Sequence, residues 1–161
     1  MNKVIEIDFL PKETDVAFSW LGSIGQSTQR RILIVDNDKN TTHLVKILLE
    51  KTGRYVVVEE NDSTGAHQRA KNFRPDLIFL DADIPGRGAS EIAIQIRTDP
   101  ELQGTPIIFL TALAMGAEAN TGLQMDEHPF LAKPIDIQEL IKGIEAHVTA
   151  PPQSMGYDTR V

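Results

Sequence analysis

The stretch that decides the fold is Leu77-Ile-Phe-Leu-Asp-Ala-Asp-Ile-Pro-Gly86. Its four leading apolar residues predict a buried strand, and this strand stops on Asp81 beside a Pro-Gly turn. A strand that ends in this way brings a carboxylate to the carboxyl edge of a parallel sheet, where open α/β folds bind their ligands. An Asp at this point is also an ordinary way to start a loop, so the other strands must decide between the two interpretations.

Three further apolar runs end in polar residues in the same manner. They lead from Ile32–Val35 into Asp36-Asn37-Asp38, from Ile107–Leu110 into Thr111, and from Pro129–Ala132 into Lys133-Pro134. Because parallel strands share one carboxyl edge, we expect four strands to gather acids, a hydroxyl and an ammonium group there.

Segments with helical spacing alternate with these runs, which is typical of βα units. A fifth strand is expected over Tyr55–Glu59. Helices are expected from the Asp36 loop to Gly53, from a cap at Asn61-Asp62-Ser63 to Asn72, over Ser90–Thr98, and from an Asp136 cap to about His147. The segment Ala112–Met125 has the place of a further helix, but Gly116, Asn120 and Gly122 are poor helix formers, and we expect it to be mobile. The fold class is α/β, a doubly wound five-stranded parallel sheet with helices on both faces.

The chain of 161 residues fits one domain with additions at its ends. We expect an extension or linker over 1–30, the domain over 31–148 and a polar tail over 149–161. The extension ends in a Gly-, Ser- and Gln-rich stretch, and its larger apolar residues could dock on the domain or on a partner. These are Phe9, Phe18, Trp20 and Leu21.

Composition excludes several classes of function. A formal charge of −7 argues against a nucleic-acid binder. The absence of Cys excludes disulfides, thiol nucleophiles and thiolate metal sites. Neither a signal peptide nor a run of about 20 apolar residues is present, so we expect a cytoplasmic protein that is not in a membrane.

The expected edge carries its own chemistry. Four acids, Asp36, Asp38, Asp81 and Asp83, repel one another unless a cation joins them. Oxygen ligands without His or Cys favour a hard ion such as Mg²⁺. With the hydroxyl of Thr111 and the charge of Lys133, the set describes phosphoryl transfer through an aspartyl-phosphate.

These motifs resemble the receiver domains of two-component response regulators, of the stand-alone chemotaxis type. The resemblance covers residues 31 to about 148, and the spacings of 45, 30 and 22 residues between Asp36, Asp81, Thr111 and Lys133 are those of that family. It implies a flavodoxin-like sheet in the order 2-1-3-4-5. It also implies a signalling module whose only chemistry is self-phosphorylation from a donor and autodephosphorylation.

The resemblance assigns a role to each matching position. Asp81 matches the phosphoacceptor, which takes a phosphoryl group from a histidine kinase or phosphotransfer protein. Asp36, Asn37, Asp81 and the backbone carbonyl of Asp83 match the Mg²⁺ ligands. The phosphoryl-binding and switch positions are matched by Thr111, Ala112, Lys133 and the aromatic Phe130. Pro134 stands where the family often has a cis peptide bond.

Two departures from the family are visible. Asn37 replaces a usual acid, which removes a negative charge and should weaken Mg²⁺ binding; Asp38 or the side chain of Asp83 could partly compensate. Arg87, in Arg87-Gly88-Ala89, replaces the first residue of the usual Met-Asp-Gly. It could reach the phosphoryl group or simply face solvent.

Three functions therefore remain open. The first is a phosphorylated receiver that signals to an output protein through the face formed by the fourth helix, fifth strand and fifth helix, a face that could also form a homodimer. The second is a pseudo-receiver that signals without phosphate, because of Asn37. The third is a haloacid-dehalogenase-type phosphatase, which needs an acidic pair after Lys133 that this chain does not supply at a strand end.

Overall fold

A computed structural model of the protein describes residues 29–86, 88–112 and 128–148. Strands and helices alternate along these ranges, as the sequence pattern predicts. The elements are β1 (Arg30–Val35), α2 (Lys39–Glu50), β2 (Tyr55–Glu60), α3 (Ala66–Phe73), β3 (Leu77–Asp81), α4 (Ala89–Thr98), β4 (Ile107–Thr111), β5 (Phe130–Ala132) and α5 (Ile137–His147).

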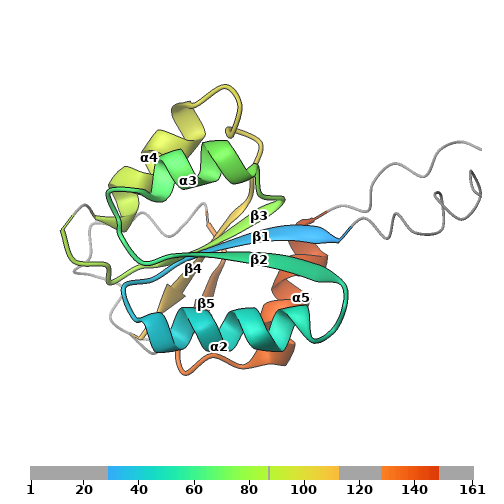
Figure 1. Cartoon of the computed structure of the whole chain (residues 1–161). Coiled ribbons are helices and arrows are strands. Elements are labelled where there is room, and N and C mark those ends of the chain that lie inside the picture. Colours follow the sequence, from blue (N-terminus) through green and yellow to red (C-terminus); the bar gives the residue numbers. More distant parts are fainter. Residues whose placement is uncertain (1–28, 87, 113–127, 149–161) are drawn as a thin grey trace, which may run out of the picture.

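The strands form one five-stranded sheet in the order β2-β1-β3-β4-β5, and every neighbouring pair is parallel. Helices α3 and α4 cover one face and α2 and α5 cover the other (Figure 1). The predicted fold class, the strand order and the placement of helices on both faces are confirmed.

The apolar strands are buried because both faces of the sheet are covered. Alternate residues of β3 point to opposite sides: Ile78 and Leu80 pack with Ala70 of α3 and Ile92 of α4, whereas Leu77 and Phe79 pack in the second core. The second core also holds Val45 and Leu49 of α2 and Leu140 and Ile144 of α5. A strand buried on both faces reads as a continuous apolar run, which explains the opening motif.

The helix ends follow their capping residues, with one correction. Asp38 caps α2 and Asp136 caps α5, each by accepting a hydrogen bond from the backbone two residues ahead. Gly53, at φ +75°, closes the turn after α2. The predicted cap of the next helix at residues 61–63 is wrong, because α3 begins only at Ala66. Asp62 instead accepts from the backbone N–H and the hydroxyl of Thr64 and closes a turn.

Some expectations fall outside the described residues. They include the structure of residues 1–28 and 149–161, and the predicted mobility of Ala112–Met125, of which only Ala112 is described. No helix within the described ranges is long and apolar enough to span a membrane.

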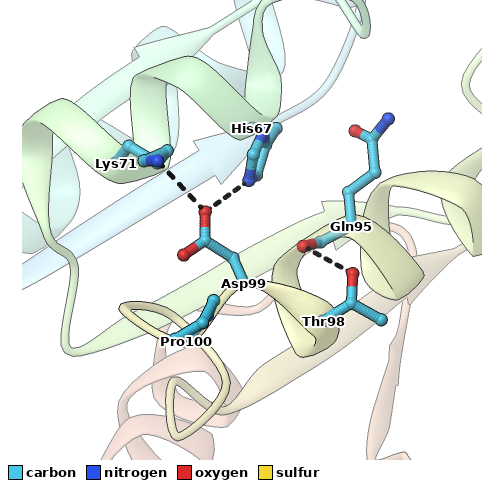
Figure 2. A pocket seen from close by; sticks show the side chains of 6 residues that line it. All are labelled: His67, Lys71, Gln95, Thr98, Asp99 and Pro100. Atoms are coloured by element: carbon cyan, nitrogen blue, oxygen red, sulfur yellow. Dashed lines mark hydrogen bonds and ion pairs between the residues drawn. The ribbon is translucent and has the colours of Figure 1, made fainter.

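A polar cluster joins α3 to the loop after α4. Asp99 is almost fully buried, and its Oδ2 lies 2.8 Å from Nε2 of His67 and 3.5 Å from Nζ of Lys71. Its other oxygen accepts from the backbone N–H of Glu101 at 2.9 Å. Figure 2 shows Asp99 reaching across from its loop toward the two α3 side chains. The hydrogen bond from Glu101, and then those from His67 and Lys71, lower the pKa of Asp99 against the opposing effect of burial.

We expect Asp99→Asn to lower the free energy of unfolding at pH 7, because the neutral amide loses the charge attraction to Lys71. A lowered folded-state pKa gives stability that is present above the ordinary value of 3.8 and is lost as the pH falls through the folded value. The difference between variant and wild type should therefore shrink near pH 3. Urea unfolding at both pH values measures it, with the more exposed Glu101→Gln as the charge-matched control. An equal difference at both pH values would contradict the assignment.

Candidate functional site

The sheet register brings the polar strand ends together at one edge. Val35 pairs with Leu80, so Asp36 is level with Asp81. Asp81 pairs with Leu110, so Thr111 lies one residue beyond it. Thr111 pairs with Ala132, so Lys133 is one residue further still. The stagger of parallel strands thus converges residues that are up to 97 positions apart in the chain.

Lys133 joins the two central carboxylates. Its Nζ lies 2.7 Å from Oδ2 of Asp36 and 3.2 Å from Oδ1 of Asp81. The exposed fraction is 0% for Asp36 and 3% for Asp81, so neither charge is solvated by bulk water. The ammonium group therefore supplies part of the charge balance that two buried acids require.

The electrostatics of Asp81 are set by competing effects. Burial raises its pKa, and the neighbouring charge of Asp36 raises it further, while the hydrogen bond from the Asp83 N–H and the charge of Lys133 act in the opposite direction. For Lys133, burial favours the neutral amine, but the hydrogen bond and charge of Asp36 outweigh it and raise the pKa. Lys133 is therefore a firmly charged ammonium at neutral pH.

The loop after β1 is held by its own polar groups. Oδ1 of Asp36 accepts from the backbone N–H of Asp38 at 2.9 Å. The Asn61 amide donates to the carbonyl of Asp36 at 2.8 Å and to the buried Thr42 hydroxyl at 3.0 Å. Sequence reasoning treated Asn61 only as a helix cap and missed this role. Its position directly after β2, beside β1 in the sheet, was the signal that could have identified it.

The loop after β3 is arranged around Asp81. Oδ1 of Asp81 accepts from the backbone N–H of Asp83 at 3.1 Å, and the Asp83 side chain lies 3.5 Å from the backbone N of Ala112, at the end of β4. The turn continues to Gly86, whose φ of +88° favours glycine. Asp81 therefore lies at the carboxyl end of β3, directly before this turn.

The remaining predicted residues are placed as follows. Thr111 is buried in the last position of β4, whereas Phe130 opens β5 with a side chain that is 51% exposed. The peptide bond between Lys133 and Pro134 is cis. Arg87 lies outside the described residues, so its two interpretations stay open.

The oxygen donors of this edge fit Mg²⁺ in kind. The two carboxylates share one ammonium partner, so their contacting oxygens lie within about 6 Å of each other, and a hard cation prefers such ligands. Among the described residues, however, no group of three or more His, Cys, Asp and Glu side chains could hold a metal ion. Asn37 stands where the family usually has a further acid, and Asp38 directs its carboxylate to the α2 backbone and Thr41 instead. Backbone carbonyls and the Asn37 amide would have to complete the ligand set.

Asp38 is thus a capping residue here. The hydrogen bond from the Thr41 hydroxyl, followed by that from the Asn40 backbone, lowers the pKa of Asp38. These bonds occupy both of its oxygens, which weakens the expectation that it compensates for Asn37.

Comparison with known proteins agrees with this geometry. The profile of the response regulator receiver domain matches residues 32–145. Protein PilH of Pseudomonas aeruginosa is 30% identical over 116 residues, covering 72% of this chain and 95% of PilH. Response regulator ArlR of Staphylococcus saprophyticus is 33% identical over 123 residues, covering 76% of this chain but 54% of ArlR. The chain thus spans about half the length of such larger relatives.

Solved structures give the same assignment. The receiver domain of Klebsiella pneumoniae RstA aligns with a TM-score of 0.63 at 25% identity, covering 74% of this chain and 99% of that one. Chemotaxis protein CheY4 of Vibrio cholerae, at 24% identity, shares the fold with a TM-score of 0.65 over 74% of this chain and 98% of its own. From its matched profile, its relatives and its strand-end acids, the chain belongs to the response regulator receiver domain family.

Proposed function

We propose that this receiver accepts a phosphoryl group on Asp81, from a histidine kinase or phosphotransfer protein, and signals to an output protein. The observation that supports the proposal most is the position of Asp81. It is a nearly buried carboxylate at the carboxyl edge of the sheet, with an ammonium group 3.2 Å away. A buried nucleophile with a fixed cation beside it suits phosphoryl transfer, in which catalysis is mainly positioning and charge neutralisation.

The proposed reaction uses the two oxygens of Asp81 differently. The bonds from Asp83 and Lys133 both fall on Oδ1, so Oδ2 is the attacking atom. A P–O bond forms there as the P–N bond of a donor phosphohistidine breaks, and the departing imidazole nitrogen keeps the electron pair of that bond and takes up a proton. Lys133 balances charge on the transferred group, and Thr111 offers a hydroxyl beside it. Bound Mg²⁺, held by Asp36, Asp81, the Asp83 carbonyl and Asn37, would neutralise phosphoryl oxygens.

A phosphate-independent receiver is the second candidate, and Asn37 favours it. The pair Asp36 and Asp81 with Lys133 carries a net charge of −1, whereas an acid in place of Asn37 would make it −2. Lower negative charge weakens the attraction for a divalent cation. Membership of the receiver family favours both candidates over a haloacid-dehalogenase-type phosphatase.

We expect Mg²⁺-dependent phosphorylation of the wild type by acetyl phosphate. Asp81→Asn removes the nucleophile and should abolish the mass increase of one phosphoryl group seen by intact-protein mass spectrometry. Asp62→Asn, which removes an acid from an exposed turn, is the matched control and should be labelled normally. A folded wild type that gains no mass would overturn the proposal and leave the phosphate-independent receiver.

Asn37→Asp should strengthen Mg²⁺ binding by about tenfold, or about 1.4 kcal/mol, because it adds one negative charge close to the ion. Titration followed by the NMR signals of the Asp83 and Ala112 amides measures the affinity. Asp38→Asn removes a charge from the same loop without touching the proposed ligands, and should change the affinity less. An unchanged affinity in Asn37→Asp would show that residue 37 is not part of the metal site.

Asp81→Asn should raise the free energy of unfolding at pH 7 by roughly 1 kcal/mol, since it removes a buried charge beside Asp36. A raised folded-state pKa means that ionised Asp81 costs stability, and that this cost grows as the pH rises from 3.8 through the folded value. The gain should therefore vanish at acidic pH, where Asp81 is protonated. Urea unfolding with a metal chelator present measures it, and the exposed Asp83→Asn controls for net charge. A less stable Asp81→Asn at pH 7 would contradict the account.

A further inference from the structure

An apolar groove runs between α2 and the loop that follows β5. Its cavity of about 340 Å³ is lined chiefly by Leu44, Val45, Leu48, Pro134 and Ile135, together with Lys133. Leu44 is 54% exposed, and Ile47, one turn further along α2, is 50% exposed. An exposed apolar groove of this kind marks a contact site.

The first described residue of the chain, Gln29, lies next to the carboxyl end of the same helix. The side-chain amide of Gln29 donates to the carbonyl of Gly53 at 3.0 Å, and Gly53 closes the turn after α2. Leu44 lies six residues before Glu50, the last residue of α2, a rise of about 9 Å along the helix. Residues 1–28 therefore join the domain next to the turn that follows α2.

The sequence just before this entry point supplies an apolar segment at a suitable distance. Phe18-Ser-Trp-Leu21 is separated from Gln29 by the Gly- and Ser-rich residues 22–28. An eight-residue step of such composition spans about 16 Å on average and at most about 28 Å. A tether that matches the span to its site gives an effective concentration in the millimolar range, so even weak apolar contacts suffice for docking.

We propose that Phe18–Leu21 docks in the groove between α2 and Pro134–Ile135. The segment is rich in large apolar side chains and the groove is apolar, so docking removes both surfaces from water. The docked segment lies beside the loop that carries Lys133, and it covers one flank of the sheet edge. This inference does not depend on phosphorylation of Asp81.

The other pockets of the described residues fit such a segment less well. The pocket between α3 and α4 (Figure 2) is lined by His67, Lys71 and Asp99, and the Asp99 carboxylate already contacts both of the other side chains. It also lies on the opposite face of the sheet from α2 (Figure 1). Residues 149–161, which follow α5 in the chain, contain few large apolar side chains, chiefly Met155 and Tyr157. They are therefore a poorer match for an apolar groove than Phe18–Leu21.

Trp20 is the single tryptophan of the chain, so its fluorescence reports directly on docking in the full-length protein. We expect wild-type emission at shorter wavelength than free tryptophan, with reduced quenching by acrylamide. Leu44→Ser should lower the docking equilibrium constant about tenfold, shifting emission to longer wavelength and raising quenching. Because Leu44 is exposed, the domain should remain folded, which circular dichroism checks.

The control is Ile94→Ser, the same kind of change at a residue that is 59% exposed on α4, and it should leave Trp20 unaffected. Three results would overturn the proposal. They are wild-type quenching equal to that of free tryptophan, equal effects of Leu44→Ser and Ile94→Ser, and emission that depends on protein concentration together with a dimeric mass. The last result would assign the groove to a second copy of the chain.

Discussion

Lys133 holds its ammonium group between two carboxylates that water scarcely reaches, 2.7 Å from Asp36 and 3.2 Å from Asp81. Two unpaired charges in such a place would be costly, so the edge of the sheet can be acidic only because this cation is present. The contact also ties the short edge strand β5 to β1 and β3, across the whole width of the site. The fold and the site thus depend on one segment, because the residues that form the edge strand β5 lead directly into Lys133.

Asn37 changes the balance of this arrangement. With two central acids and one fixed cation, the edge stands one charge from neutrality before any ion or ligand arrives. The exposed Asn37 side chain offers only a neutral oxygen, and Asp38 is engaged in capping α2. The local sequence therefore directs its nearby acid toward helix stability, and Lys133 offsets half of the charge of the two central acids.

The sheet was predictable because the central strands β1, β3 and β4 contain continuous apolar runs that two helical layers cover, and such runs stand out in a sequence. The site followed from the same pattern, since parallel strands share an edge and the register then fixes the order of Asp36, Asp81, Thr111 and Lys133. The pattern could not say which oxygen Lys133 contacts, because that depends on side-chain packing between distant segments. It also misplaced the start of α3. Asp62 finds a partner in Thr64 two residues away, and this local turn competes with capping. Asn61 was misjudged for the opposite reason, because its partners lie 19 and 25 residues earlier and a local pattern does not reveal them.

The two ends of the described domain meet around Arg54. The backbone N–H of Arg30 donates to its carbonyl at 2.9 Å, and its guanidinium pairs with Glu145 near the end of α5 at 2.9 Å. The first strand and the last helix are thus neighbours at the edge of the sheet that faces away from Asp81. The two ends of the described domain thus lie close together, as is common for chain termini in domains. A short peptide could join residue 148 to residue 29, and the chain could be opened at a distant loop without disturbing the acidic edge.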